Sequence, residues 1–416
     1  MTSPKPRVAI VGAGFAGVEA AKKLGKNGVN VLLIDRHNYH TFIPMLYQVA
    51  TAVVYPHQII YPLRSLFRGL PTVNFLQADI TKIDLQLQII HAENIAIDYD
   101  YLVIATGSQS QYLGVTGAPE NSFPMRTLHD AIAIRNQVLS RFEQAAITDD
   151  EEEKIRLLTF VIVGGGATGV ELAGSLNELI HNAFKKDYPN LDRDRARVIL
   201  LQSGEQLFPS YPQQLGNYTE KYLRRHGVKV HLNSKVSKVT PEAVYLEDNT
   251  SIFTDTVIWT AGVLAATPET KQSVKTAAKD KIIVEQTLQL CGHKNVYGVG
   301  DVSYVDTQEE FNGVAQEAIQ QGKTAADNIL RQMRGESLKP FDYFNKGRLA
   351  IIGKHAGVGK IGKFAIKGFI AWFLWLEVHL LYLRGIRNRL GVLGNWLKNY
   401  FFGEGASRVI ISTGNK

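Results

Sequence analysis

The feature that most constrains the fold is an internal repeat. Residues 8–24 read VAIVGAGFAGVEAAKKL and residues 160–176 read FVIVGGGATGVELAGSL, so the two segments align at an offset of 152 residues. In each copy a strand-like, β-branched run precedes the pattern GxGxxG, and a helix-like segment follows it. The aligned residues are Gly12 with Gly164, Gly14 with Gly166, Gly17 with Gly169 and Glu19 with Glu171. A duplicated strand–glycine–helix unit predicts an α/β fold with two Rossmann-like dinucleotide-binding domains.

Each glycine of the pattern has its own physical role. The first permits the tight turn from strand to helix, the second lets a pyrophosphate approach the backbone, and the third lets helix and strand pack closely. The phosphates then lie at the helix N-terminus, where amide groups and the positive end of the dipole attract them. One such pattern is weak support, because glycine-rich turns are common. Two copies in the same context predict two nucleotide sites.

The residue that ends the second strand of each copy discriminates between ligands. Asp35 follows the β-run of residues 29–34 and is placed to accept hydrogen bonds from a ribose 2′-hydroxyl, as a flavin or NAD site requires. Gln202 takes this place in the second copy, after residues 197–201. An amide does not repel a 2′-phosphate as a carboxylate does. The sequence therefore leaves open whether NADH, NADPH or both are used.

Five further segments complete the expected domains. Residues 99–107 (YDYLVIATG) and 295–301 (NVYGVGD) are strands that end in small-residue turns, and the second ends in Asp301, which is placed to bond a flavin ribityl hydroxyl. A helix is expected over 309–330, a capping box over 127–130 and a solvated linker over 149–153. We expect an FAD-binding domain at 1–118 and 285–338, an NAD(P)H-binding domain at 119–284 and a C-terminal membrane-association domain at 339–416.

The C-terminal segment is the basic part of the chain. The whole sequence has a net charge of +7, whereas residues 339–416 hold 13 Lys or Arg against three acidic residues, a charge of +10. Such asymmetry indicates an anionic partner, a membrane or a nucleic acid. From residue 365 onward, apolar residues recur at helical spacing between basic residues, as in helices that lie in a bilayer interface. The apolar positions are Phe369, Trp372, Phe373, Leu376, Leu380, Leu383, Leu390, Leu393, Leu397, Tyr400 and Phe401.

The alternative to a membrane anchor is a dimerisation helix with a charged outer face, and the two can coexist. No nucleic-acid partner is expected, because the tryptophans belong to an apolar stripe and no binding module is present. No apolar run reaches the length of about 20 residues that a transmembrane helix needs. The single cysteine, Cys291, excludes a disulfide framework and thiolate-rich metal sites, and we expect it to be buried and unreactive. No metal site is predicted.

At this point the residues resemble a known family, the type II NAD(P)H dehydrogenases: single-subunit, non-proton-pumping NAD(P)H:quinone oxidoreductases within the two-dinucleotide-binding-domain flavoproteins. The resemblance covers nearly the full length. The motifs that carry it are NYHTFIPMLYQVA at 38–50, GGGATGVELAG at 164–174, GVGD at 298–301, AQEAIQQG at 315–322 and VHLLYLR at 378–384. Sulfide:quinone reductases are similar but need several redox cysteines, which this chain lacks.

The resemblance implies a role for each matching residue. Those that would contact FAD are Gly12, Gly14, Gly17, Asp35, Thr106, Gly107 and Asp301. Those that would contact the nicotinamide cofactor are Gly164, Gly166, Gly169 and Glu171. Ala315, Gln316 and Gln320 would lie beside the isoalloxazine, where family members bind the quinone headgroup. Gln202 departs from the NADH-specific pattern, which has an acidic residue, and is similar to the NADPH-using branch that includes prenylnaphthoquinone reductases.

Simpler interpretations remain for these residues. Glu171 could be a first-turn carboxylate favoured by the helix dipole, as its counterpart Glu19 suggests, and Gln316, Gln320 and Gln321 could form an ordinary polar helix face. The expected function is an FAD-dependent NAD(P)H:quinone oxidoreductase, attached as a peripheral, monotopic protein to the cytoplasmic or equivalent inner face of a membrane. The alternatives are a soluble flavin reductase with another acceptor and a non-catalytic redox sensor. A homodimer is left open.

Overall fold

The computed structural model describes residues 6–93, 95–192, 195–305, 313–402 and 408–411. The chain forms two compact units. Unit 1 comprises Met1–His40, Tyr61–Gln109 and Val263–Lys346; unit 2 comprises Thr41–Ile60, Ser110–Gly262 and Gly347–Lys416. The short strands β3 (Tyr39–Thr41), β4 (Ile60–Pro62), β10 (Ser108–Ser110) and β19 (Val263–Ala265) lie where the chain passes from one unit to the other.

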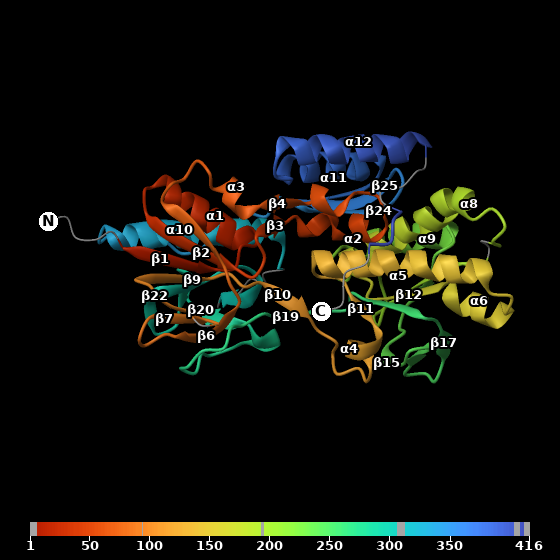
Figure 1. Cartoon of the computed structure of the whole chain (residues 1–416), viewed down its shortest axis with the longest axis horizontal. Coiled ribbons are helices and arrows are strands. Elements are labelled where there is room, and N and C mark those ends of the chain that lie inside the picture. The colour runs from red at the N-terminus through yellow and green to blue at the C-terminus, as the bar shows by residue number, and fades with distance from the viewer. Residues whose placement is uncertain (1–5, 94, 193–194, 306–312, 403–407, 412–416) are drawn as a thin grey trace. The chain divides into compact units, whose positions relative to one another are not determined.

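Unit 1 is built on an eight-stranded sheet in the order β23-β20-β21-β22-β9-β1-β2-β5 (Figure 1). Its central strands β1, β2, β5, β9 and β22 are parallel. Both faces of such strands are covered in an α/β fold, which is why residues Val8–Val11 of β1 are apolar and buried. The strand bounds are β1 (Arg7–Val11), β2 (Asn30–Asp35), β5 (Val73–Gln77), β9 (Tyr101–Ile104), β20 (Ile282–Val284), β21 (Gln289–Leu290), β22 (His293–Gly298) and β23 (Ser303–Val305).

Helices α1 (Phe15–Lys26) and α10 (Ala315–Met333) pack side by side in unit 1. The approach is close, because a Cβ atom at Gly322 would collide with the carbonyl oxygen of Ala16. The unit also contains α3 (Leu63–Leu66), the short helices η5 (Ala278–Asp280) and η6 (Gly300–Val302), and an antiparallel sheet of β6 (Ile80–Asp84), β7 (Ile89–Ala92) and β8 (Ile95–Asp98).

Unit 2 repeats the parallel core in a smaller sheet, with the order β11-β18-β12-β13-β14. The strands are β11 (Phe123–Pro124), β12 (Thr159–Val163), β13 (Arg197–Leu201), β14 (Lys229–His231) and β18 (Thr256–Trp259). All five residues of β12 are buried. The helices are α4 (Ala118–Asn121), α5 (Leu128–Ile147), α6 (Glu151–Leu157), α7 (Ala167–Glu178), a π-segment (Leu179–Ala183), α8 (Phe184–Asp187) and α9 (Gln213–Arg225).

The remainder of unit 2 surrounds α7. Strands β24 (Arg348–Gly353), β25 (Ala356–Ile361) and β26 (Phe364–Gly368) form an antiparallel sheet, followed by α11 (Phe369–Tyr382) and α12 (Ile386–Phe402). Helix α7 packs against α2 (Leu46–Ala50) and β24. Unit 2 also holds the short helices η1 (Ile43–Met45) and η2 (Pro56–Gln58) and the antiparallel strands β15 (Val236–Val239), β16 (Ala243–Leu246) and β17 (Ser251–Phe253).

Several local expectations need correction. Residues 364–368 form a strand paired with β25, so the C-terminal helix begins at Phe369 and not at Ala365. Helix α10 begins at Ala315 rather than 309, and residues 309–312 lie outside the described residues. The acidic run is a helix whose first turn is capped by the Asp150 carboxylate, which accepts the amides of Glu152 and Glu153. Cys291 is exposed rather than buried.

The compact units also divide the chain differently from the expected domains. The cuts fall at 109/110 and 262/263, where we expected 118/119 and 284/285. Most of the C-terminal segment, expected as a separate domain at 339–416, belongs to unit 2 with the second glycine loop, whereas residues 339–346 belong to unit 1. Close packing explains this, since a Cβ atom at Gly174 of α7 would collide with the carbonyl of Ile352 in β24. The capping box of α5 is confirmed, with Thr127 and Asp130 exchanging two hydrogen bonds.

Candidate functional site

The two glycine loops share the strained turn that the sequence predicts. Gly12 has φ +104° and Gly164 has φ +113°, a region that side chains other than glycine rarely adopt. A Cβ atom at Gly17 would collide with the carbonyl oxygen of Gly12, and one at Gly169 with that of Gly164. The first and third glycines of both copies are therefore required by the backbone itself.

The second glycines leave room for a ligand. Gly14 and Gly166 are the N-cap residues of α1 and α7, neither of which has a side-chain cap. A Cβ atom at either position would meet no atom within 4 Å. The first amides of both helices thus border open space, where the helix dipole favours a phosphate. Both loops fit the pyrophosphate of a dinucleotide.

The strand-end residues fasten these loops in the same way. The Asp35 carboxylate accepts the amide of Ala13 (2.7 Å), and the Gln202 carboxamide oxygen accepts the amide of Gly165 (2.9 Å). Ala13 and Gly165 are equivalent positions of the repeat. Sequence reasoning had assigned Asp35 and Gln202 only to the ribose. The geometry shows a second role, which an uncharged carboxamide performs as well as a carboxylate.

The predicted flavin residues lie around the first loop. A Cβ atom at Gly12 would approach the Thr106 amide, so the end of β9 adjoins the loop. The Thr106 hydroxyl is buried and has no hydrogen-bond partner among the residues that the structure describes. An orphaned buried hydroxyl is costly unless a ligand satisfies it. Gly107 has φ +74°, and Asp301 accepts the Ser108 hydroxyl at 2.6 Å. These residues fit FAD.

The glutamines of α10 do more than form a polar face. Gln316 accepts the amide of Lys346 (3.1 Å), and Gln320 exchanges two hydrogen bonds with the backbone of Phe344. They thereby fasten residues 344–346 to the helix that starts at Ala315. Gln321, which sequence reasoning considered only as part of a polar helix face, is buried and accepts the amide of Gly300 (2.6 Å), beside Asp301. Its position in the AQEAIQQG motif was the available signal.

Glu171 lies in a different setting from its counterpart in the repeat. Its carboxylate is buried on α7 and accepts two hydrogen bonds, from the amide of Ile351 (3.2 Å) and the indole of Trp375 (3.1 Å). Burial raises its pKa to about 8, although these two bonds oppose the shift. Trp375 stacks on His379 with ring centroids 3.7 Å apart, and burial lowers the pKa of that histidine to about 4.

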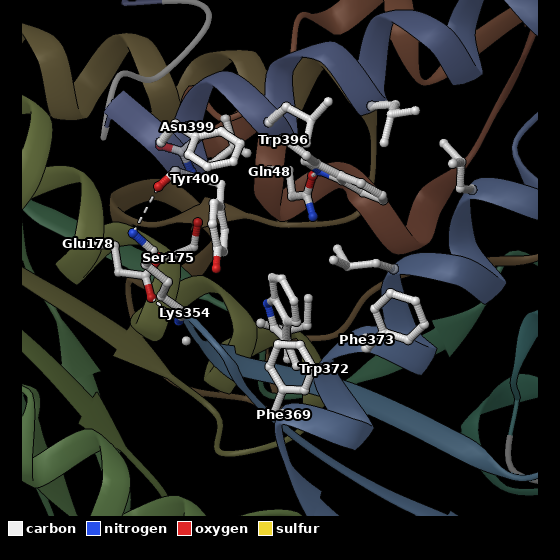
Figure 2. Close-up of a pocket in the computed structure, with 18 of the residues that line it drawn as sticks. Gln48, Ser175, Glu178, Lys354, Phe369, Trp372, Phe373, Trp396, Asn399 and Tyr400 are labelled. Atoms are coloured by element: carbon white, nitrogen blue, oxygen red, sulfur yellow. Dashed lines mark hydrogen bonds between the residues drawn. The ribbon is translucent and has the colours of Figure 1, made fainter.

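A pocket of about 540 Å³ lies in unit 2 between α2, α7, α11 and α12 (Figure 2). Most of its wall is apolar. Its polar residues include Gln48, Ser175 and Glu178, and Glu178 accepts the amide of Lys354. Burial raises the pKa of Glu178 to about 7. Sequence reasoning gave no role to Gln48 or Glu178; the available signals were that Gln48 belongs to the motif at 38–50 and that Glu178 lies about two helical turns after Glu171.

The sequence analysis predicted no metal site. No group of three or more His, Cys, Asp or Glu residues arranged to hold a metal ion occurs within the described ranges of the chain. In the same part of the chain, no helix is long and apolar enough to cross a membrane.

Comparison with known proteins first defines the class. The sequence model described as pyridine nucleotide-disulphide oxidoreductase matches residues 6–326, and the model described as NDH2 C-terminal domain matches residues 345–404. The chain is similar to the type II NADH:quinone oxidoreductase Ndh of Mycobacterium tuberculosis, with 35% identity over 94% of this chain and 87% of the relative. It is also similar to the internal alternative NAD(P)H-ubiquinone oxidoreductase A1 of Arabidopsis thaliana, with 27% identity over 97% and 86%.

The fold agrees with these relationships. The structure of NDH2 from Plasmodium falciparum in complex with NADH superposes with a TM-score of 0.90, at 19% identity, over 98% of this chain and 100% of that one. The sulfide:quinone oxidoreductase of Aquifex aeolicus gives a TM-score of 0.74 at 18% identity, over 95% of each chain. At these identities the likeness concerns the fold alone. By sequence, the chain belongs to the type II NADH:quinone oxidoreductase family.

Proposed function

We propose that this protein is an FAD-dependent NAD(P)H:quinone oxidoreductase that passes two electrons from NAD(P)H through the flavin to a membrane quinone, without pumping protons. The observation that carries the proposal is the pair of glycine loops at residues 12–17 and 164–169, which we call the two cradles. Each cradle is open at its second glycine, and each is held by a hydrogen bond to a strand-end side chain. Family membership supports the reaction. FAD, when bound, supplies the hydride-accepting chemistry, and the chain binds, orients and shields the reactants.

The residue assignments follow the two cradles. FAD would be held by Gly12, Gly14, Gly17, Asp35, Thr106, Gly107, Asp301 and Ala315. NAD(P)H would be held by Gly164, Gly166, Gly169 and Gln202. Gln316 and Gln320 would border the quinone headgroup, held in place by their bonds to residues 344–346. Glu171 would act close to the reacting groups as a carboxyl that stays largely protonated at neutral pH, because burial raises its pKa to about 8.

The second cradle supports use of both nicotinamide cofactors. Gln202 is neutral, and it fastens the loop through its carboxamide oxygen. A 2′-phosphate at this strand end would meet no carboxylate from this residue. The M. tuberculosis relative is named for NADH and the A. thaliana relative for NAD(P)H.

Peripheral membrane association is supported by the surface of α11 and α12. Ile370, Phe373, Leu381, Ile386 and Phe401 are large apolar side chains of these helices, and each is more than half exposed. Basic residues lie among them, and an apolar face with cationic neighbours favours an anionic bilayer surface. We propose a monotopic attachment on the cytoplasmic or equivalent inner face. A homodimer through the same face is the alternative.

The purified full-length protein tests the function. We expect bound flavin, bleaching of that flavin by NADH or NADPH under anaerobic conditions, and rapid reoxidation by a short-chain quinone. Protein that is colourless and takes up no flavin contradicts the proposal. Flavin that stays oxidised with both reductants would instead support a redox sensor.

The attachment needs a gentler test than truncation, because residues 347–402 cover α7. Replacing Phe373 and Phe401 with Glu should release the protein from anionic vesicles in flotation assays while its flavin content stays unchanged. Val409→Glu, an exposed substitution outside these two helices, is the matched control. Vesicle binding unchanged in the double variant would refute this attachment.

A further inference from the structure

The pocket of unit 2 has two chemically different parts. One part is formed by apolar side chains of α11 and α12. The volume of the whole pocket, about 540 Å³, is within the range of small-molecule sites, roughly 300–1,000 Å³. Figure 2 shows Glu178, Ser175 and Lys354 on one side, and Phe373 on the other. The apolar residues are Phe369, Trp372, Phe373, Leu376, Leu380, Leu393, Trp396 and Leu397.

The polar side chains are held in place before any ligand enters. Gln48 accepts the indole N–H of Trp396 (2.8 Å) and donates to the Tyr47 hydroxyl (3.0 Å). The Thr51 hydroxyl donates to the Tyr47 carbonyl (2.8 Å), so in its 2.6 Å contact with Ser175 the serine is the donor. Such preorganised, neutral groups orient a ligand head without the cost of ordering them on binding.

The charges on the wall select against an anionic head. Glu178 and Glu377 line the pocket, and both disfavour an anionic group. The one cation among the lining residues, Lys354, donates to the Tyr400 carbonyl (3.1 Å) and lies over the Tyr400 ring at 5.1 Å. A phosphate or carboxylate head would have to compete for this ammonium group beside a glutamate. A neutral head meets no such conflict.

We propose that this pocket binds an uncharged amphiphile, with one apolar chain and a neutral hydrogen-bonding head, and that Glu178 takes up a proton when the ligand binds. A lipid quinone has this chemistry, and in that case the inference rests on the proposed function. A neutral glyceride from the bilayer has it too. Proton uptake by Glu178 is the same for both ligands, because it depends only on the apolar chain of the ligand lying next to the Glu178 carboxyl.

The coupling follows from desolvation. A buried carboxylate is penalised relative to the acid, and burial already raises the pKa of Glu178 to about 7. A ligand that displaces the remaining water increases this penalty, so it binds the protonated form more tightly. By linkage, the affinity falls as pH rises above 7.

Other ionisable groups around Glu178 determine the controls. Tyr47 and Tyr222 stay neutral at moderate pH, because burial raises the pKa of each. Glu171, whose pKa burial raises to about 8, is the group that could imitate the effect. The ionisable groups that face Glu178 or line the pocket with it are Tyr47 of α2, Glu171 of α7, Tyr222 of α9, Lys354 and His355 of the β24–β25 turn, Glu377 of α11 and Tyr400 of α12.

Isothermal titration calorimetry of the full-length holoprotein tests the proposal. Decylubiquinone is the probe in one arm and monocaprin is the probe in the other. Each titration is run in two buffers of different ionisation enthalpy, and the difference between the two measured binding enthalpies gives the number of protons taken up. At about pH 7.5 we expect net proton uptake, and we expect affinity to fall roughly tenfold between about pH 6 and about pH 8.5. Binding of either probe with this signature supports the site, and the arm that binds identifies the source.

Variants separate proton uptake by Glu178 from a structural effect of replacing this residue. E178Q keeps an acceptor for the Lys354 amide but has no proton to gain, so it should bind with no proton uptake and no pH dependence. H355Q is the matched control that should retain both. L376W should fill the pocket and abolish binding at every pH, which keeps the test decisive should E178Q fold poorly.

Three results overturn the proposal: no binding of either probe, wild-type binding that is independent of pH, or proton uptake that persists in E178Q. The proposed function is tested separately by flavin content and by bleaching of the flavin with NADH in the absence of quinone. Failure there leaves the glyceride arm as an independent measure of the pocket.

Discussion

Glu19 and Glu171 occupy the same position of the repeat and have opposite surroundings. Glu19 on α1 faces a cation, Lys323 of α10, at 3.8 Å. Glu171 on α7 is buried and accepts hydrogen bonds from Ile351 and Trp375. The difference lies in what packs on each helix, since α10 brings a lysine to α1 while β24 and α11 bring an amide and an indole to α7. The same local sequence thus yields an ion pair in one unit and a carboxyl with a raised pKa in the other.

Asp35 and Gln202 form the complementary comparison, because here the geometry is the same and the charge differs. Each fastens its glycine loop with one accepted amide hydrogen bond, of 2.7 Å and 2.9 Å. Fastening a loop requires only an oxygen atom. The charge of that side chain is therefore available to discriminate between nucleotides.

The largest effect should come from breaking one cradle at a time. Gly12→Val and Gly164→Val each force a side chain into positive φ, at a cost of about 1–3 kcal/mol before any collision with neighbours. We expect G12V to lose its flavin, and G164V to keep its flavin but to be reduced by NADH at least tenfold more slowly. Absorbance spectra and anaerobic stopped-flow traces measure these outcomes. Flavin loss in both variants would mean that the copies are not assigned to separate cofactors.

The contrast between the two glutamates can be sharpened by stability measurements. Burial raises the pKa of Glu171 from 4.5 to about 8, so the folded chain binds this proton more tightly than the unfolded chain. The stability that it contributes is fully present below about pH 4.5 and is lost as pH rises through about 8. E171Q should therefore be more stable than wild type above pH 8, by about 1–3 kcal/mol.

E19Q is the matched variant in the first copy. It removes only a partly exposed ion pair, and we expect a loss below about 1 kcal/mol that added salt reduces. Thermal unfolding of E171Q and E19Q from about pH 6 to about pH 9 tests both predictions. Equal pH dependence in E171Q and wild type would show that Glu171 does not carry the raised pKa.

Gln202→Glu tests the charge difference between the two strand ends. The carboxylate should still fasten the loop but should repel a 2′-phosphate, so the ratio of kcat/KM for NADH to that for NADPH should rise at least about tenfold. Q202A, which loses the loop bond, should weaken both cofactors without changing their ratio. An unchanged ratio in Q202E would show that this residue does not face the ribose.

The smallest effect is expected at Gln316. Gln316→Leu loses the bond to the Lys346 amide and a polar group beside the expected quinone site. We expect quinone reduction to slow roughly threefold to tenfold while flavin reduction by NADH is unchanged, a difference of about 1 kcal/mol in one half-reaction. Equal slowing of both half-reactions would place the quinone elsewhere.

Sequence reasoning found the residues whose partners are local or repeated. The glycines, Asp35, Gln202 and Glu171 were identified because each has a counterpart at a fixed place in the repeat. It missed Gln48 and Glu178, because their partners are distant in the sequence. Trp396 lies 348 residues from Gln48, and Lys354 lies 176 residues from Glu178. It also extended the C-terminal helix into residues 365–368, since basic and apolar residues alternate there in a way that a strand tolerates as well.

The sequence by itself determined the two cradles, because a glycine at positive φ and a glycine under a carbonyl oxygen are backbone requirements that no packing partner can replace. It also determined the charge difference between Asp35 and Gln202. Only the tertiary structure decided that Glu171 is buried, that desolvation raises the pKa values of Glu171 and Glu178, and that α11 and α12 enclose a pocket with α7. Desolvation depends on every segment that covers a group, and those segments come from chain regions that local pattern does not connect.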